Sequence, residues 1–543
     1  MKALIIGLDG ATFTVLRPLM EAGYLPNLQA LVQRGASGAL QSTIPPITAL
    51  AWPTFMTGKN PGQHGLLSWQ APLNAQFERP LVNGRQIQGA KLWQLLGDQG
   101  LTVAVFNVPV TYPPEAVNGV LVAGMLTPSL NSQFTYPTAL QAELLQRFPD
   151  YQTDIVIQNI QRHTSNLKAV NQFFAQAQTI TRIRGEAFRW LLDAHTPDVA
   201  MIVFELPDRL QHILWTYIQA LPNAVNDSTH AVALRDWLIQ SYQLLDEEIG
   251  ALFVREKAGP YIFILSDHGF GPLTTNVYLN DWLRHHGLLA YHQGRVSSWG
   301  LLRQIGKRFK RWIPGALIAR GLQAVPLWKT IDWHQTKAYA GLPTEYGIFL
   351  NVAGREPVGQ VQTADYEKVR QEIMTLLANW RDPQSGTLVM KAVYRREEIY
   401  RGPYVERAPD IVFELNSGYR ISELAAPTTG MLLDSRIQDP LGWHEAEGVF
   451  VMAGPGIANH CPLTYARIED VMPTLLYSLG LPIPDDVDGR VLLEAFEPPW
   501  QAEHPIRVQA GSRPNAVDEI DSGYSTAESQ QLTKRLRDLG YLS

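Results

Sequence analysis

Near its beginning the chain reads Ala3-Leu4-Ile5-Ile6-Gly7-Leu8-Asp9, a run without polar side chains that ends abruptly at a carboxylate. Such a run is typical of a strand that is buried on both faces of a sheet. Strands of this kind, alternating with longer helical patterns, predict an α/β fold with a mostly parallel central sheet and helices on both of its faces. Similar runs recur at Leu101–Phe106, Val120–Ala123, Val199–Phe204, Tyr261–Leu265, Ile411–Phe413 and Gly448–Met452.

The length and composition narrow the class of protein. With 543 residues, the chain can form one large α/β domain with insertions, or two domains. A formal net charge of -6 gives no overall indication of a nucleic-acid polymer as partner. The single cysteine, Cys461, excludes an intrachain disulfide and suits a reducing compartment. The first apolar run is too short for a signal peptide, and no stretch approaches the ~20 apolar residues of a transmembrane segment, so we expect a soluble, cytoplasmic protein.

Two stretches interrupt the alternation of strands and helices and are interpreted as insertions, near 131–190 and 285–345. The first is rich in Gln and Ala and predicts helical structure. The second contains a basic segment, residues 303–311, beside aromatic residues. This segment has two interpretations. It is either an anion-collecting lid or membrane-surface helix, or a solvated helix face, which is the commoner case.

The last part of the chain has a pattern of its own. Residues 498–523 contain Ala, Pro and Asn and predict a linker. Ser525 and Glu528 match a capping box, which predicts that a short helix opens within 524–543. We expect this helix to dock on the core through an apolar face formed by Leu532, Leu536 and Leu539.

Carboxylate and imidazole side chains stand close to the ends of the predicted strands. Asp9, Asp208 and Asp267 each follow a predicted strand directly or within a few residues. His268 comes next to Asp267, and His444 stands just before the last run. Because ligands of such sheets collect outside the carboxyl ends of the strands, we expect several of these side chains to meet at one edge. Gathered in one place they would repel, or stay protonated, unless cations held them together, so the pattern predicts a metal site.

Asp208 and His212 add a helical signal to this pattern. Their spacing of four residues places both side chains on one face of a helical turn. Zinc accepts such mixed nitrogen and oxygen ligands at about 2.0–2.2 Å. A lone Asp-His pair is more often a turn or a helix cap, and a single histidine such as His64 or His334 is more often structural. The hypothesis therefore depends on several fragments taken together.

A candidate nucleophile lies in the segment Pro45–Gly58. Here a Pro-Pro stretch, which favours extended backbone, gives way at Thr48 to a helix-forming segment. We expect Thr48 to be the N-cap, with its hydroxyl near the positive end of the helix dipole and beside free backbone N–H groups. A threonine hydroxyl is a poor nucleophile near pH 7, and metal coordination is one way to activate it. The alternative is that Thr48 only caps the helix, and the local pattern does not separate it from Thr43, Thr54 and Thr57.

In their order and broadly in their spacing, these fragments resemble the type I phosphodiesterase / nucleotide pyrophosphatase family of the alkaline-phosphatase superfamily. The segments Ala408–Val412, Ala453–Ile457 and Asp470–Thr474 are similar to later parts of that family. The resemblance extends over residues 1–497 and implies one catalytic domain, an alkaline-phosphatase-like three-layer sandwich with helical cap insertions. It also implies a hydrolase that cuts phosphodiester or pyrophosphate bonds in small, nucleotide-like molecules.

Carried over to this sequence, the resemblance implies two divalent metal ions, zinc by preference with Mn or Fe as alternatives. Thr48 would attack phosphorus in line and form a phosphothreonine, which activated water would then hydrolyse. The two metals would stabilise the attacking and the leaving oxygen together. One metal would be held by Asp208, His212 and His444, and the other by Asp9, Thr48, Asp267 and His268.

One position departs from the family pattern. The family usually carries an Asn shortly after a His-Gly pair, and its amide donates to a phosphate oxygen, whereas here Trp69 stands at that position after His64-Gly65. Because an indole offers a single N–H donor, a phosphomonoesterase or phosphotransferase is an alternative function. A non-catalytic metal-binding scaffold, or a homo-oligomer, is also compatible with the sequence. Candidate contacts to a small-molecule phosphoester substrate, each also compatible with a structural role, are Trp52, Trp69 and Tyr112.

Overall fold

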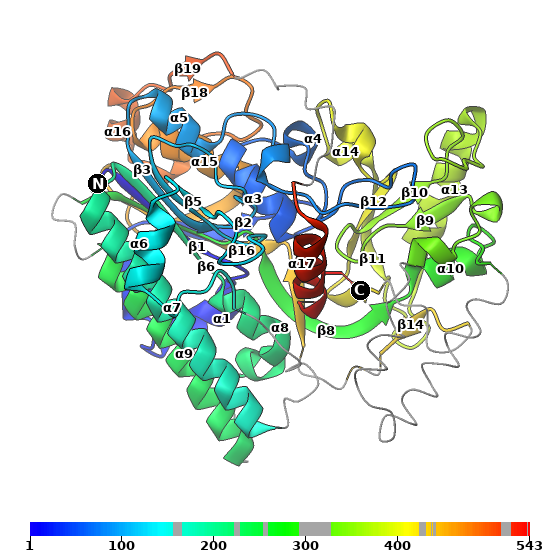
Figure 1. The fold of residues 1–543 in the computed structure, drawn as a ribbon, viewed down its shortest axis with the longest axis horizontal. Coiled ribbons are helices and arrows are strands. Elements are labelled where there is room, and N and C mark those ends of the chain that lie inside the picture. Colours follow the sequence, from blue (N-terminus) through cyan, green and yellow to red (C-terminus); the bar gives the residue numbers. More distant parts are fainter. Residues whose placement is uncertain are drawn as a thin grey trace.

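The structure is a computed structural model that describes residues 1–155, 166–221, 229–253, 259–292, 327–422, 430–435, 437, 441–511, 523–539 and 541–542. The basic segment 303–311, for which the sequence left two interpretations open, lies outside these ranges. Parts of both predicted insertions and of the predicted linker also lie outside them. Figure 1 shows a large layered part, in which helices surround a sheet, and beside it a smaller part built mainly of strands.

The central sheet of the described chain is mostly parallel, as predicted. Its strand order is β17-β2-β16-β7-β1-β6-β3-β4-β5. β16 runs against both of its neighbours and β5 runs against β4, while the other neighbouring pairs are parallel. The strands are β1 (Ala3–Leu8), β2 (Ala36–Gln41), β3 (Val103–Val108), β4 (Gly119–Ala123), β5 (Thr135–Tyr136), β6 (Val199–Phe204), β7 (Tyr261–Leu265), β16 (Glu447–Ala453) and β17 (Cys461–Arg467).

The middle of the sheet is formed by β1 with β6 and β7 on either side of it. Every residue of these three strands is buried, as continuous apolar runs predict. In the register of the strands, Leu8 faces Phe204 and Gly7 faces Leu265. The segments that leave the three strands therefore start side by side at one edge of the sheet.

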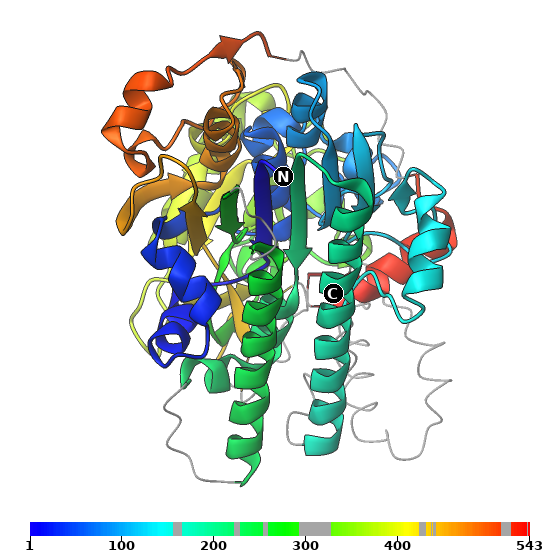
Figure 2. The same cartoon turned by 90° about the vertical axis from the view of Figure 1, so that its left-hand side faces the viewer.

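Helices cover both faces of the sheet, which confirms the predicted fold class. On one face α7 (Leu167–His195) and α9 (Thr229–Phe253) run side by side, and on the other α3 (Thr48–Thr57) packs against α15 (Ile468–Ser478) (Figures 1 and 2). The stretch 131–190 is largely helical where it is described. Further helices are α1 (Phe13–Glu21), α2 (Pro26–Gln33), α4 (Pro61–His64), α5 (Leu92–Asp98), α6 (Leu140–Arg147) and α8 (Leu206–Gln219).

A second set of strands begins shortly after β7. There β8 (Gly269–Val277) pairs with β13 (Gly418–Ile421), β14 (Leu433–Asp434) and β15 (Gly442–Glu445). A further antiparallel sheet, ordered β11-β12-β10-β9, contains the run Ile411–Phe413, which therefore does not belong to the central sheet. The elements of this part are β9 (Ala338–Ala340), β10 (Gly347–Leu350), β11 (Met390–Arg395), β12 (Ile411–Leu415), α10 (Leu279–His285), α13 (Tyr366–Ala378) and α14 (Arg396–Ile399).

The first half of the predicted linker is described. Residues 498–511 contain α16 (Pro498–Glu503) and β19 (Val508–Gln509), and β19 pairs with β18 (Ile483–Pro484). Pro498 and Pro499 start α16, because proline is well suited to the first turn of a helix. Residues 512–522 lie outside the described chain, and the division into a catalytic domain, a linker and a helix stays a prediction.

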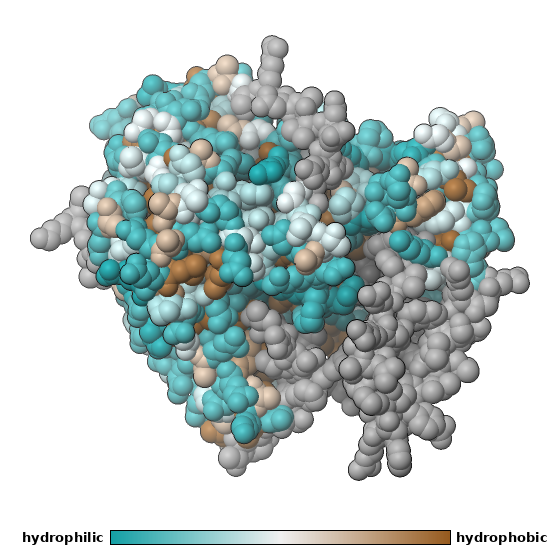
Figure 3. All heavy atoms as spheres, viewed as in Figure 1, coloured by the Kyte–Doolittle hydropathy of each residue, from teal (hydrophilic) through white to brown (hydrophobic). Residues whose placement is uncertain are grey.

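The capping box at Ser525 opens α17 (Thr526–Asp538). The Ser525 hydroxyl accepts from the backbone N–H of Glu528, and the Glu528 carboxylate accepts from that of Ser525. The leucines of the apolar face are buried, with exposed fractions of 1–2%: Leu532, Leu536 and Leu539. No helix in the described ranges combines the length and the hydropathy that a membrane span requires. Figure 3 shows a face on which hydrophilic residues prevail and apolar residues form only small patches.

Candidate metal centre

Three carboxylates meet at the edge where the parallel strands end. Asp9 follows β1, Asp208 lies in the first turn of α8 after β6, and Asp267 follows β7. The backbone N–H of Asp9 donates to Phe204 O, and that of Asp208 donates to Asp9 O, both at 3.0 Å. The backbone N–H of Gly10 donates to Asp267 Oδ1 at 3.2 Å. The positions of these carboxylates thus follow from the register of the sheet.

His444 reaches the same edge by a different route. It comes before β16 in the sequence, whereas Asp9 and Asp267 come after their strands. Because β16 is antiparallel to β7, the beginning of β16 lies at the edge where β7 ends. His444 itself belongs to β15, opposite Phe270 of β8. The rule that sites lie beyond the carboxyl ends of strands therefore accounts for His444 only once the direction of β16 is known.

Thr48 lies at the N-terminus of α3, but it is not the N-cap that the sequence predicts. The N-cap is Ile47, whose φ of -130° and ψ of 144° are extended, and Thr48 is the first helical residue. The β-branched Ile47 favours this extended backbone. The Thr48 side chain is therefore not in the capping position, and its hydroxyl lies 3.3 Å from His268 Nε2.

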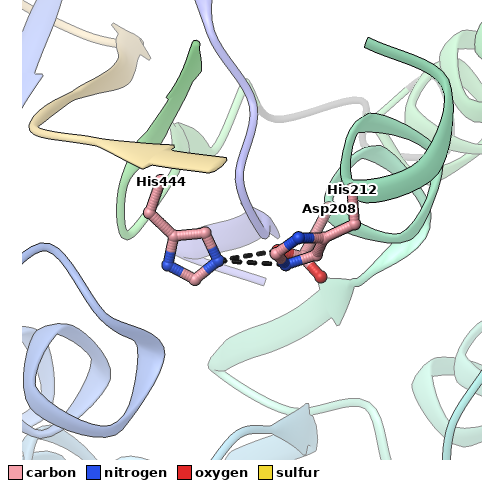
Figure 4. Close-up of side chains that lie close together, drawn as sticks. All are labelled: Asp208, His212 and His444. Atoms are coloured by element: carbon pink, nitrogen blue, oxygen red, sulfur yellow. Dashed lines mark hydrogen bonds and ion pairs between the residues drawn. The ribbon is translucent and has the colours of Figure 1, made fainter. Parts of the chain in front are cut away.

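Asp208, His212 and His444 converge on one point (Figure 4). The Nε2 atoms of His212 and His444 lie 3.3 and 3.5 Å from Asp208 Oδ1, and 3.1 Å from each other. Asp208 and His212 both belong to α8 and face each other across one turn, as their spacing predicts. Two imidazole nitrogens at this distance require a proton or a cation between them, because their lone pairs would repel.

Asp9, Asp267 and His268 form a second group, with Thr48 beside it. His268 Nε2 lies 3.4 Å from Asp267 Oδ2 and 3.8 Å from Asp9 Oδ1. The rings of His268 and His444 stack with their centroids 3.7 Å apart, so the two groups adjoin. The structure thus brings together all of the side chains that the sequence analysis combined into one site.

The donor atoms of both groups fit divalent metal ions. The Nδ1 atoms of His268 and His444 each lie 3.1 Å from a backbone carbonyl oxygen, so Nδ1 carries the proton and Nε2 keeps its lone pair. Tetrahedral zinc with ligands at about 2.1 Å would separate neighbouring ligand atoms by about 3.4 Å, close to the spacing found here. One oxygen of each carboxylate is buried without a hydrogen bond to any described residue: Asp9 Oδ1, Asp208 Oδ1 and Asp267 Oδ2.

The site is almost completely removed from water. The predicted ligands, Thr48 included, are between 0% and 5% exposed. Burial raises the pKa of Asp267 to about 8, and burial together with the neighbouring carboxylates raises the pKa of Asp9 well above its usual range. Burial also lowers the pKa of His268 and of His444. A divalent cation would take the place of protons on Asp9 and Asp267, and neutral imidazoles are the form of histidine that binds a metal ion.

A buried cation, Arg209, belongs to the site although the sequence analysis assigned it no role. Arg209 is 1% exposed, contacts the Asp208 carboxylate through Nη1 and donates from Nη2 to Asp154 Oδ1 at 3.0 Å. Burial acts to raise the pKa of Asp208, yet His212 and Arg209 hold that pKa well below its usual range. His212 and Arg209 together thus keep Asp208 ionised. Its place next to Asp208 in the sequence was visible, but its second partner comes from a stretch without any motif.

Two of the candidate substrate contacts lie in structural positions. Trp52 is fully buried, and its indole N–H donates to Asp9 Oδ2 at 3.1 Å. Trp52 therefore orients a candidate metal ligand. The ring of Tyr112 stacks on that of Tyr524, just before α17, with centroids 5.7 Å apart and planes 8° apart. The third candidate, Trp69, is fully buried and stacks on Tyr541 at 5.2 Å.

Tyr541 is a residue that the sequence analysis did not single out. It is completely buried, and its hydroxyl lies 3.5 Å from His212 Nε2. Burial, together with the Asp208 charge, raises the pKa of Tyr541 well above its usual range, so the hydroxyl keeps its proton. No local signal marks this residue, because its approach to the site depends on how α17 docks.

Comparison with known proteins places the chain in a family. A sequence profile described as type I phosphodiesterase / nucleotide pyrophosphatase matches residues 3–446. The chain belongs to this family. As a member of the type I phosphodiesterase / nucleotide pyrophosphatase family it is a hydrolase of the phosphoesterase type, as the motifs implied. Comparison with curated protein sequences gives no match.

Solved structures that match this family member were also found. Phosphonoacetate hydrolase from Sinorhizobium meliloti 1021, in complex with phosphonoformate, is 18% identical with a TM-score of 0.53, over 87% of this chain and 94% of that chain. Murine ectonucleotide pyrophosphatase / phosphodiesterase 5, in complex with AMP, is 11% identical with a TM-score of 0.47, over 90% and 97%. The human protein of the same name is 13% identical with a TM-score of 0.46, over 89% and 95%. The first likeness shows a shared fold.

Proposed function

We propose that this protein is a two-metal phosphoesterase that hydrolyses phosphodiester or pyrophosphate bonds in small, nucleotide-like molecules. The observation that carries the proposal is the pair of adjoining ligand groups, in which each carboxylate keeps one buried oxygen without a hydrogen bond to a described residue. Membership of the family supports the same class of reaction. The cytoplasmic location and any homo-oligomer stay predictions from the sequence.

Each of the two proposed ions has its own set of ligands. Zinc is the ion we propose, with Mn or Fe as alternatives, because mixed nitrogen and oxygen ligands at these spacings suit it. Ions of this kind lower the pKa of a coordinated oxygen and neutralise charge on a phosphoryl group. One set is Asp208, His212 and His444, and the other is Asp9, Asp267, His268 and Thr48.

Thr48 is the proposed nucleophile. Its side chain is buried, and its hydroxyl lies beside His268 at the first helical position of α3. The N-terminus of α3 adds backbone N–H groups and the positive end of the helix dipole, which both favour a phosphoryl group. In-line attack by Thr48 Oγ1 breaks the bond from phosphorus to the leaving oxygen and forms a phosphothreonine. Water then hydrolyses this ester and restores the hydroxyl.

The choice between diester and monoester is tested with two chromogenic substrates. We expect the zinc-loaded protein to hydrolyse bis(p-nitrophenyl) phosphate with a higher kcat/KM than p-nitrophenyl phosphate. A strong preference for the monoester would contradict the proposal and favour the phosphomonoesterase or phosphotransferase that Trp69 left open. Failure to hydrolyse either, combined with metal content well under two equivalents, would favour a non-catalytic scaffold.

The role of Thr48 is tested by Thr48→Ala. Turnover should fall roughly a thousandfold or more, with metal content close to that of the wild type. Thr57→Ala is the matched control, because Thr57 lies at the other end of α3 and its hydroxyl donates to Pro53 O at 2.7 Å. Retained turnover in Thr48→Ala would show that another group is the nucleophile.

A further inference from the structure

The α17 segment, residues 523–539 and 541–542, is docked on the loop that follows β4. Arg535 donates to two backbone carbonyl oxygens of this loop, each at 3.0 Å. The Tyr524 hydroxyl donates to Leu126 O at 3.2 Å. The apolar face of α17 is buried as well. Contacts along its whole length make this segment a fixed part of the fold.

The α17 segment places Tyr541 directly at the metal centre. The backbone N–H of Tyr541 donates to Leu536 O at 2.9 Å, which turns the chain back after the helix. The Tyr541 ring lies edge-on to the rings of His212 and His444, with centroid distances of 5.7 and 5.5 Å. Tyr541 therefore bounds the site on the side of the Asp208 group.

Trp69 extends this boundary into a two-ring wall. The planes of Trp69 and Tyr541 are 15° apart, with centroids at 5.2 Å. Trp69 is completely buried, yet its indole N–H has no hydrogen-bond partner among the described residues. Burying a donor without an acceptor costs free energy, so such a group beside a candidate site points to an acceptor that a ligand supplies.

The Tyr541 hydroxyl also lacks an acceptor once the site is loaded. In the structure its neighbour is His212 Nε2, at 3.5 Å. If His212 Nε2 binds a metal ion, its lone pair is no longer available to the hydroxyl. An oxygen of the phosphoryl group is then the acceptor that the proposed reaction brings to this place.

We propose that Tyr541 is a specificity-determining residue, whose hydroxyl donates to the phosphoryl group and whose ring, backed by Trp69, favours compact phosphoesters over bulky ones. The inference rests on the proposed function and adds a substrate class to it. Because the wall is held by the docking of α17, the limit on substrate size is part of the fold.

Two variants of Tyr541 separate the role of the hydroxyl from that of the ring. Tyr541→Phe removes only the hydroxyl, whereas Tyr541→Ala removes the wall. Tyr524→Phe is the matched control, since it removes a hydroxyl from the same segment but leaves Tyr541 in place. The substrates are methyl p-nitrophenyl phosphate, which is compact, and bis(p-nitrophenyl) phosphate, which is bulky and has the same leaving group.

The expected results differ between the variants. Tyr541→Phe should lower kcat/KM about tenfold for both substrates, because the variant loses one hydrogen bond to a charged group. Tyr541→Ala should raise the ratio of bulky to compact kcat/KM by about tenfold or more, while Tyr524→Phe leaves the ratio unchanged. An unchanged ratio in Tyr541→Ala would overturn the proposal. A rise for both substrates alike would overturn it too, since it would show that Tyr541 blocks the site.

Binding of inorganic phosphate tests Tyr541 without turnover. Titration calorimetry on the zinc-loaded protein should give a Kd about tenfold weaker for Tyr541→Phe than for the wild type and for Tyr524→Phe. Equal affinities would overturn the role of the hydroxyl. If the wild type binds phosphate in this way but hydrolyses neither diester, the proposed reaction fails while the contact to the phosphoryl group stands.

Discussion

The environment of His64 makes the stability of the protein depend on pH in a defined way. His64 is fully buried, its Nδ1 accepts from the backbone N–H of Leu66 at 3.3 Å, and its Nε2 lies 3.1 Å from Thr54 Oγ1. A proton on Nδ1 would face the Leu66 N–H, another donor. Burial lowers the pKa of His64 to about 3, with a contribution from the charge of Lys59. The neutral ring therefore links α4 to Thr54 of the helix that begins at Thr48.

The direction of this pH dependence follows from a comparison of proton binding by His64 in the folded and the unfolded protein. In the unfolded chain the pKa of a histidine is about 6.5, so between about pH 6.5 and pH 3 the unfolded state binds more protons at this site than the folded state. The contribution of the neutral His64 ring to the free energy of unfolding is therefore fully present above about pH 6.5, and it decreases as the pH falls below that value. At about pH 5 the loss is about 2 kcal/mol, from about 1.5 pH units at about 1.36 kcal/mol each.

His64→Gln removes the titration and keeps an amide in place of the ring. Both proteins are unfolded in urea at pH 7.5 and at pH 5.0, with a chelator present so that metal affinity does not contribute. A difference in unfolding free energy between the two proteins that does not depend on pH cancels when the two pH values are compared. Between these pH values the wild type should lose about 2 kcal/mol more than the variant. An equal loss would refute the assignment of His64 as a buried neutral histidine.

Three further changes have defined outcomes. Arg209→Met should lower the free energy of unfolding in urea by about 3–5 kcal/mol, because Asp154 and Asp208 stay buried without their cation. Unchanged stability would contradict this ion-pair network. Trp52→Phe should weaken zinc binding roughly tenfold or more in competition with a chelating dye, because Asp9 loses a donor; equal affinity would show that the contact does not orient Asp9. Leu536→Ala should lower the free energy of unfolding by about 2–5 kcal/mol and speed proteolysis within α17. Equal cleavage rates in the variant and the wild type would contradict the docking of α17.

The sequence indicated the fold class and most of the site because both depend on local patterns. Apolar runs such as the one before Asp9 predict buried strands, and a side chain directly after such a strand must lie at the edge of the sheet. The four-residue spacing of Asp208 and His212 matches one turn of an α-helix, so it predicts that both side chains lie on the same face. These signals need no knowledge of how distant segments pack.

Other features depend on packing, which local patterns do not predict. His444 reaches the site because β16 runs against its neighbours, and a strand has the same apolar pattern in either direction. Arg209 and Asp154 meet through tertiary contacts alone. Tyr541 approaches His212 only because α17 docks on a distant loop, and the capping box predicts that helix but not its place.

Metal stoichiometry tests the central claim, two adjoining metal sites on one chain, most directly. Elemental analysis of the zinc-loaded protein after gel filtration should give two equivalents per chain. Asp208→Asn and Asp267→Asn should each retain about one equivalent, because each removes a ligand from a different group. A wild-type value well below two equivalents, or values in both variants equal to that of the wild type, would contradict a two-metal centre built from these residues.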